Sequence, residues 1–155
     1  MDLNLKAFLS MIAVSEGTKD IGEDGYNIIV GSTKANPVCF MDYSDHPRIK
    51  VWIESIGKYS TAAGRYQVLS WIFDHYKKQL NLSGFWPDDQ DKIAIQLIRE
   101  CGALYDIANG AFDAATFKCR SRWASLPGAG YGQHENKLEA LRKAFIDNGG
   151  IITPL

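Results

Sequence analysis

Helical spacing of apolar residues constrains the fold of this chain more than any other feature of its sequence. Near the N-terminus, apolar residues recur three and four positions apart, which places them on one helical face: Leu5, Phe8, Leu9 and Ile12. Two later stretches repeat the spacing, with faces formed by Leu69, Ile72, Phe73, Tyr76 and Leu80 and by Ile93, Leu97, Ile98 and Cys101. The sequence therefore predicts a helix in each of these three stretches.

Capping residues predict where some of these helices begin and where two more lie. Pro87 and the two aspartates that follow it suit the positive N-terminus of the third helix. Asp113 is predicted to cap a helix that reaches Trp123. A last helix is predicted in NKLEALRKAFIDNGG, closed by Gly149.

Little of the chain predicts β structure. YNIIVG (26–31) is rich in Ile and Val and predicts a short strand or hairpin. From Ser32 to Ser60 the pattern is irregular, although KVWIESI favours a short strand or a helical turn. We expect an α+β protein that is mainly helical with a small β element.

Length and charge limit the class of protein. A chain of 155 residues with 46% hydrophobic content fits one globular domain over residues 1–155. A formal net charge of −1 without long runs of like charge disfavours a nucleic-acid partner. The N-terminus lacks the pattern of a secretory signal, and no stretch reaches the roughly 20 apolar residues of a transmembrane helix. We expect no membrane insertion.

Cysteine and histidine positions do not form a recognisable reactive or metal-binding motif. Cys39, Cys101 and Cys119 are widely spaced without CxxC, which predicts free or buried thiols of a protein made in a reducing compartment. The three histidines are far apart in sequence and no HExxH occurs, so a zinc amidase is disfavoured. No GxSxG occurs either, which disfavours a serine hydrolase. We expect no metal and no cofactor.

The apolar face of the first helix ends in a carboxylate. Glu16 lies four residues after Ile12 on that face, and Gly17 follows where a left-handed cap is usual. One interpretation is a half-exposed glutamate at a frayed helix end that only forms ion pairs. In the functional interpretation, the negative end of the helix and the apolar neighbours both disfavour ionisation, so we expect the pKa of Glu16 to rise. A glutamate kept protonated near neutral pH suits a general acid.

Two glycine-containing loops combine aromatic rings with amides, at STAAGRYQ (60–67) and SLPGAGYGQ (125–133). Such groups suit sugars, whose faces carry C–H groups and whose rims carry hydroxyls. The residues concerned are Gly64, Tyr66 and Gln67 in the first loop, and Tyr131 and Gln133 in the second. The alternative is that each loop is only a turn between helices.

Five segments, spread over nearly the whole chain, carry a resemblance to a known family. They are KAFLSMIAVSEGT (6–18), GYNIIVG (25–31), DYSDHPR (42–48), STAAGRYQVLS (60–70) and WASLPGAGYGQ (123–133). In their order and spacing they resemble the lambda-lysozyme family of phage endolysins, which act as lytic transglycosylases. The chain departs from the family pattern at Ala63, where the family has glycine.

The resemblance implies a lysozyme-like fold with a small β-sheet beside a groove for the glycan strands of peptidoglycan. It implies that Glu16 is the catalytic acid, that loops 47–57 and 126–137 form lips over the groove, and that the products end in 1,6-anhydro-MurNAc. The substrate-binding residues are then expected to be Ser60, Thr61, Gly64, Arg65, Tyr66, Gln67, Tyr131 and Gln133.

The resemblance also implies a place of action. An endolysin of this type waits in the host cytoplasm until a separate holin opens the inner membrane, and it then reaches the periplasm and cell wall. We expect a monomer that forms no stable complex with the holin.

Two other functions stay open. A hydrolytic muramidase would need a second carboxylate beside Glu16. Asp20, Glu23 and Asp24 follow within eight residues, but in a polar loop where solvation is their simplest explanation. A non-catalytic module that binds cell-wall glycan would use the same aromatic loops without any acid.

Overall fold

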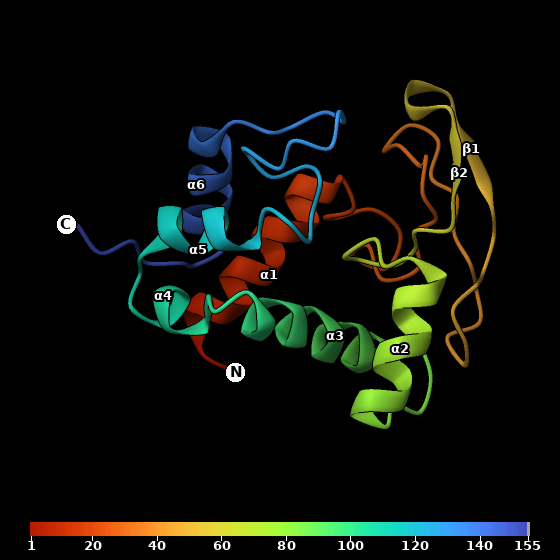
Figure 1. Cartoon of the computed structure of the whole chain (residues 1–155), viewed down its shortest axis with the longest axis horizontal. Coiled ribbons are helices and arrows are strands. Elements are labelled where there is room, and N and C mark those ends of the chain that lie inside the picture. Colours follow the sequence, from red (N-terminus) through yellow and green to blue (C-terminus); the bar gives the residue numbers. More distant parts are fainter. Residues whose placement is uncertain (155) are drawn as a thin grey trace. The chain divides into compact units, whose positions relative to one another are not determined.

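The structure, a computed structural model, describes residues 1–154 and consists of two compact units (Figure 1). The first unit combines Met1–Ser15 with the chain from Ile95 onward, and the second spans Glu16–Ala94. The elements are α1 (Leu3–Glu16), β1 (Val51–Ile53), the 3-10 turn η1 (Glu54–Ile56), β2 (Lys58–Ser60), α2 (Ser70–Leu80), α3 (Pro87–Glu100), α4 (Leu104–Ala108), α5 (Phe112–Cys119) and α6 (Leu138–Asp147). The α+β, mainly helical architecture expected from the sequence is confirmed. The single domain expected over residues 1–155 stays a prediction.

Three phenylalanines from different helices form the centre of the first unit. Phe8 of α1, Phe112 of α5 and Phe145 of α6 are buried, and their ring centroids lie 4.9 to 6.5 Å apart in tilted and edge-to-face contacts. Figure 1 shows α5 between α4 and α6, with which it is in contact. This core fixes the first fifteen residues of the chain, which lead directly into Glu16.

Burial of α1 goes further than its sequence pattern predicts. The apolar face of Phe8, Leu9 and Ile12 is buried as expected. Ala7, Met11 and Ala13 on the other sides are buried too, so the middle of the helix is enclosed all round, as expected of a helix that is apolar on every face.

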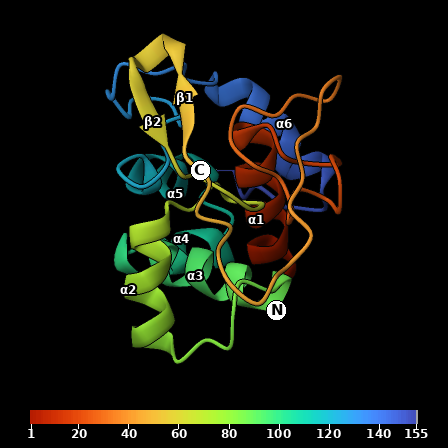
Figure 2. The same cartoon turned by 90° about the vertical axis from the view of Figure 1, so that its right-hand side faces the viewer.

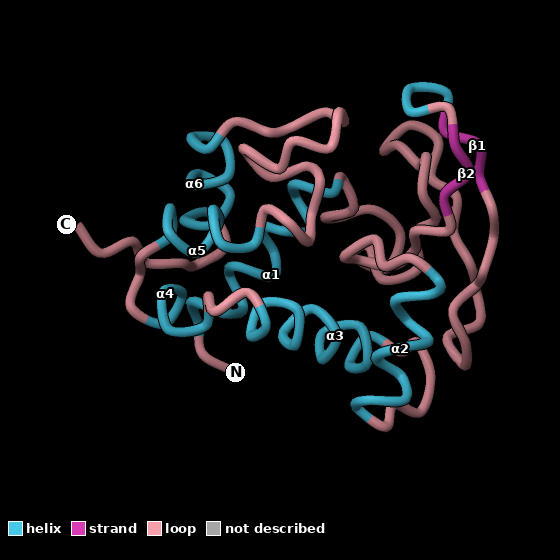
Figure 3. Tube along the Cα trace, in the orientation of Figure 1, coloured by secondary structure: helices cyan, strands magenta, loops and turns pink. Residues whose placement is uncertain are grey.

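The second unit contains the only sheet found in the described residues. β1 and β2 pair antiparallel with Trp52 opposite Tyr59, and η1 and Gly57 connect them (Figure 2). YNIIVG does not form the strand predicted for it. Ile28 and Ile29 make isolated bridges to two different segments, at Cys39 and Ala63, and a strand needs successive pairs along one partner. Figure 3 shows this region as loop between α1 and β1.

An aromatic cluster forms the core of the second unit. Phe73 of α2 packs edge-on against Phe85, with centroids 5.2 Å apart, and the buried imidazole of His46 lies 4.9 Å from the Phe85 ring. α2 begins at Ser70 and buries Phe73 and Tyr76, two of the five residues on its predicted face. The α2 helix therefore covers this core with a narrower face than its sequence suggests.

The sequence predicted some helix ends correctly and others incorrectly. α3 begins at Pro87 as expected, and the side chain of Asp89 accepts a bond from the backbone N–H of Trp86, as in a capping box. The helix predicted from Asp113 to Trp123 is wrong at both ends, because α5 begins at Phe112 and ends at Cys119. Asp113 lies inside its first turn and pairs with Arg142 at 2.7 Å.

α4 was not predicted, since its five residues are too short to show a helical period. α6 is followed by Asn148 and by Gly149 in the left-handed region, as predicted. None of the helices in residues 1–154 is long and apolar enough to cross a bilayer.

Candidate active site

Glu16 is the last residue of α1, and its side chain is half-buried. Gly17 follows with φ at +75°, a left-handed conformation that ends the helix. The residues just before it, Ala13 and Ser15, are buried. The Glu16 carboxylate therefore lies at the point where the buried part of α1 ends.

Hydrogen bonds from loop 125–136 fix the end of α1 within the first unit. The amide nitrogen of Asn136 donates to the backbone carbonyl of Ser15 at 2.9 Å and to its hydroxyl at 3.1 Å. The hydroxyls of Ser15 and Ser125 are 2.7 Å apart. Because carbonyls of a last helical turn lack partners within the helix, these bonds satisfy and orient the residue that precedes Glu16.

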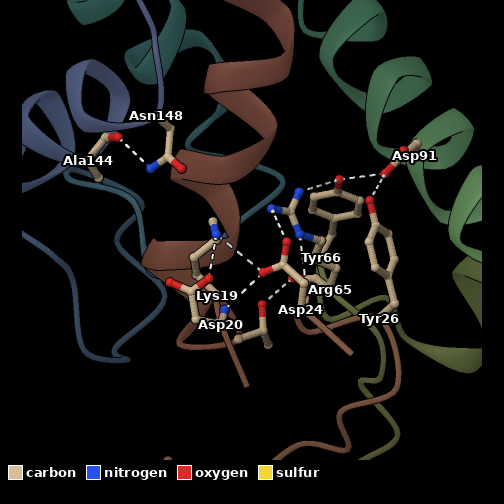
Figure 4. A network of polar contacts seen from close by, with 10 residues as sticks. Lys19, Asp20, Asp24, Tyr26, Arg65, Tyr66, Asp91, Ala144 and Asn148 are labelled. Atoms are coloured by element: carbon tan, nitrogen blue, oxygen red, sulfur yellow. Dashed lines mark hydrogen bonds and ion pairs between the residues drawn. The ribbon is translucent and has the colours of Figure 1, made fainter. Parts of the chain in front are cut away.

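In the second unit, the segment after Glu16 is tied to residues 64–66. The hydroxyl of Thr18 donates to the backbone carbonyl of Arg65 at 2.6 Å, and both residues are buried. The Arg65 guanidinium in turn donates to the backbone carbonyl of Asp24 at 3.0 Å and lies 3.4 Å from its carboxylate (Figure 4). Arg65 therefore bridges both ends of the loop that follows the candidate acid.

The same guanidinium connects to a buried carboxylate through tyrosine. Arg65 donates to the hydroxyl of Tyr66 at 3.0 Å, and the hydroxyls of Tyr66 and Tyr26 donate to Asp91 at 2.6 and 2.9 Å (Figure 4). Burial raises the pKa of Asp91, although the two tyrosine hydroxyls and Arg65 oppose the shift. This network is a support for the backbone near Glu16.

Gly64 is required by packing on α3. Its φ is +80°, and a Cβ there would collide with Oε1 of Gln90 and lie 2.9 Å from the Phe85 ring. The same Gln90 oxygen accepts a bond from the backbone N–H of Arg65 at 2.9 Å, and the Gln90 nitrogen donates to the carbonyls of Tyr26 and Phe85. The 64–67 turn is thereby locked onto the first turn of α3.

The residues expected to bind substrate divide into buried and accessible ones. Gly64, Arg65 and Tyr66 are buried, and Tyr66 is only 1% exposed, so the stacking face expected of its ring is not present in this structure. Gln67 is half-buried and donates to the carbonyl of Gly64 at 2.9 Å. Ser60 and Thr61 are half-buried as well, and Thr61 bonds the backbone N–H of Ser70 at 3.0 Å.

Three further carboxylates lie in the loop after Glu16, and each has a partner. Lys19 pairs with Asp20 at 2.7 Å and with Asp24 at 3.3 Å. The hydrogen bond from Lys19 lowers the pKa of Asp20. Glu23 accepts a bond from the Tyr43 hydroxyl at 3.0 Å. None of the three stands as an isolated base.

The tip of loop 126–137 is exposed, and the carboxylate of Glu135, in the same loop, holds its turn together. Tyr131 is 55% exposed and donates its hydroxyl to the backbone carbonyl of Ser121 at 2.7 Å, and Gln133 is exposed. The two oxygens of Glu135 accept bonds from the backbone N–H groups of Gly128 and Gly130 at 2.8 and 2.9 Å, which lowers the pKa of Glu135. Gly128 and Gly130 therefore shape a turn around Glu135.

Metal-ligating side chains do not converge within residues 1–154, where no group of three suitable residues was found. His46 is buried, with Nε2 2.8 Å from the carbonyl of Val68, and Nδ1 accepts from the N–H of Arg48. Cys39, Cys101 and Cys119 carry free thiols.

Several residues that support the site were missed by the sequence analysis. Gln90, Asp91, Glu135 and Asn136 carry most of the polar contacts described above. A signal was available only for Gln90, which lies three and seven residues before Ile93 and Leu97 on the apolar face of α3. It is a polar residue on a buried face, as Glu16 is.

Comparisons with known proteins agree with one another. Residues 6–152 match the family Endolysin. The chain is 49% identical to the endolysin of Escherichia phage P2 over 96% of this chain and 94% of that one, and 49% identical to that of Escherichia phage lambda over 95% and 92%.

Solved structures extend the comparison to the fold. Bacteriophage lambda lysozyme complexed with a chitohexasaccharide superposes with a TM-score of 0.92 at 45% identity, covering 99% of this chain and 98% of that one. A second structure of lysozyme from bacteriophage lambda gives a TM-score of 0.87 at 44% identity, with the same coverage. The resemblance noted in the sequence and the expected lysozyme-like fold are both confirmed. The chain belongs to the endolysin family of phage enzymes that degrade the bacterial cell wall.

Proposed function

We propose that this chain cleaves the β-1,4 bond between MurNAc and GlcNAc in peptidoglycan as a lytic transglycosylase, with Glu16 as its catalytic acid. Membership of the endolysin family supports a cell-wall substrate. The complex of the related lambda lysozyme with a chitohexasaccharide supports a glycan strand as the part of the wall that is bound.

The observation that carries the proposal is the contrast between Glu16 and the carboxylates near it in sequence. Glu16 is the last residue of α1; Ala13 and Ser15 before it are buried, and its own side chain is half-buried. Asp20 and Asp24 lie in the polar loop that follows, with side chains 74% and 46% exposed. Hydrolysis needs two carboxylates, one that protonates the leaving oxygen and a second that acts as base or nucleophile. A single suitable carboxylate favours a route without water.

One group is sufficient for that route. Protonated Glu16 gives its proton to the bridging oxygen as the bond from C1 of MurNAc to that oxygen breaks. The C6 hydroxyl of the same MurNAc then attacks C1, and its proton passes to the Glu16 carboxylate. The 1,6-anhydro ring forms, Glu16 is protonated again, and no water is consumed.

The remaining residues are proposed to bind and to position. We assign glycan contact to loops 47–57 and 126–137, through Tyr131 and Gln133 in the second loop, and to Ser60, Thr61 and Gln67. Gly64, Arg65 and Tyr66 are buried and are assigned to positioning the backbone after Glu16 through Thr18.

For the phage, the proposal implies a cytoplasmic protein that reaches the wall after a holin opens the inner membrane. The enzyme would act as a monomer on the periplasmic glycan strands, without a stable holin complex.

Mass spectrometry of fragments released from purified peptidoglycan tests the reaction. Anhydro-MurNAc ends without incorporation of oxygen from ¹⁸O-labelled water are expected. Reducing MurNAc ends that carry ¹⁸O would refute the transglycosylase and direct attention to Asp20 or Asp24.

Substitution of the acid provides the matched test. Glu16→Gln keeps size and hydrogen bonding but cannot deliver a proton, so activity should fall by about 10² to 10⁴-fold with the fold retained. Asp20→Asn, at an exposed ion-paired position, is the control and should keep its activity. Full activity in folded Glu16→Gln would end the assignment. Wall binding without activity in either the variant or the parent would identify a binding module instead.

A further inference from the structure

Two of the three cysteines contact each other at the ends of two helices of the first unit. Cys101 follows the last residue of α3 and is half-buried, and Cys119 is the fully buried last residue of α5. Their thiols are hydrogen-bonded to each other. Nineteen positions of chain, counted from Cys101 through Cys119, return to bring the two sulfurs together.

Arg122 completes the cluster. A turn after α5, closed by the bond from Arg122 N–H to the carbonyl of Cys119 at 3.0 Å, returns the arginine toward the end of α3. There it bonds the Glu100 carboxylate at 3.0 Å and the thiol of Cys101, which also receives a hydrogen bond from Ser121. A thiol with cationic and hydrogen-bonding neighbours and partial exposure is in the kind of environment that makes cysteines reactive.

We propose that Cys101 and Cys119 form a redox-active dithiol, in which Cys101 is the attacking thiol and Cys119 the resolving one. This site is independent of the proposed glycan chemistry and uses none of its residues.

The electrostatics assign the two roles. The hydrogen bond from Cys119 and the nearby Arg122 lower the pKa of the Cys101 thiol, whereas the hydrogen bond to Cys101 and burial raise the pKa of Cys119. Cys101 therefore carries the thiolate, and the buried Cys119 keeps its proton until its neighbour has reacted.

The reaction with a small disulfide is balanced. The Cys101 thiolate attacks one sulfur of oxidised glutathione, forming a mixed disulfide and releasing one glutathione thiolate. Cys119 then attacks the Cys101 sulfur, its proton is taken up by the second departing glutathione, and the protein disulfide forms. The two protein thiols lose two electrons and the glutathione disulfide gains them. The proposed release into the periplasm would move the protein from a reducing to an oxidising compartment. That transfer would expose it to oxidants of this disulfide class.

The test is oxidation of the folded, reduced protein by glutathione disulfide, followed by alkylation of the remaining thiols and peptide mass mapping. We expect one linked pair, Cys101 to Cys119, with Cys39 outside it. Equal amounts of links to Cys39, or a glutathione adduct on Cys101 that persists, would overturn the proposal. Oxidation in urea is the reference, since without the fold the pairing should lose its selectivity.

Single variants separate the two roles. Cys39→Ser, at the exposed thiol, should leave the 101–119 link unchanged. Cys119→Ala should stop at the glutathione adduct of Cys101, because the resolving thiol is missing. Failure of Cys101 to react in the folded Cys39→Ser protein would refute its role as the attacking thiol, whether or not Cys119→Ala folds.

Discussion

Gly64→Ala tests whether the 64–67 turn is shaped by packing on α3, as the structure indicates. At φ of +80° the residue occupies the left-handed region, where a side chain costs about 1 to 2 kcal/mol. Its new methyl group would also collide with Oε1 of Gln90 and press on the Phe85 ring.

The size of the second effect follows from what the collision breaks. Displacing Gln90 removes the acceptor of the Arg65 backbone N–H, which is buried, and an unsatisfied buried donor costs about 1 to 3 kcal/mol. The free energy of unfolding should therefore fall by roughly 2 to 5 kcal/mol in total.

Gly57→Ala is the matched control in the same unit. Gly57 has φ of +60° with no atom within 4 Å of the position of a Cβ, so only the conformational cost applies. Urea unfolding followed by circular dichroism should show that Gly64→Ala loses about 1 to 3 kcal/mol more than Gly57→Ala.

A double-mutant cycle identifies the colliding partner. With Gln90 already replaced by Ala, the extra loss at Gly64 should shrink, because the oxygen that the methyl group meets is gone. Equal losses at Gly64 and Gly57, or strict additivity with Gln90→Ala, would refute the packing argument and leave Gly64 as a candidate substrate-binding residue.

Variants at three further residues probe the loop tip and the buried network. Tyr131→Ala should weaken binding to cell-wall sacculi while lowering stability by no more than about 1 kcal/mol, and Tyr131→Phe should separate loss of the ring from loss of one hydrogen bond. A sharp drop in melting temperature at unchanged activity would contradict a binding role for Tyr131. Glu135→Gln should lower the hydrogen-exchange protection factors of the Gly128 and Gly130 amides, measured by NMR relative to the intrinsic exchange rate at each pH. The wild-type loop should lose the same protection as the pH falls through the lowered pKa of Glu135, because protonation weakens the acceptor of both bonds. Burial raises the pKa of Asp91, so its contribution to stability is full below the ordinary pKa of 3.8 and is lost as the pH rises through the pKa of the folded state. The stability of the wild type relative to Asp91→Asn should therefore decline over that pH range. A rise in relative stability would show that the pKa of Asp91 is lowered instead.

Apolar spacing predicted the existence of most long helices because burial of a face leaves a period in the sequence. α1, α2 and α3 all follow such a pattern. α5 was misplaced because Asp113 looked like a cap, whereas its carboxylate pairs with Arg142, twenty-nine residues away. Contacts of that kind leave no local signal.

In the candidate site, too, local sequence patterns were informative and contacts between distant residues were not predicted. Glu16 could be selected as the candidate acid because a charge on an apolar face is locally anomalous, and the same reasoning applied to α3 would have selected Gln90. The interpretation of Tyr66 as a stacking ring could not be corrected from sequence, because its burial depends on Tyr26 and Asp91, which are distant along the chain. A loop sequence shows which side chains are available but does not show which way they face.

Loop 125–136 combines a fixed base with a weakly held tip. At the base, Ser125 and Asn136 bond Ser15 through half-buried groups, where an unmade bond would be costly. At the tip, the closing bonds come from Glu135 to two exposed glycines, and water can replace them at little cost. Once these bonds are lost, glycine can adopt other backbone conformations, so the tip can rearrange without moving the base. Glycan binding at the tip, as proposed, would therefore leave the helix that carries Glu16 in place.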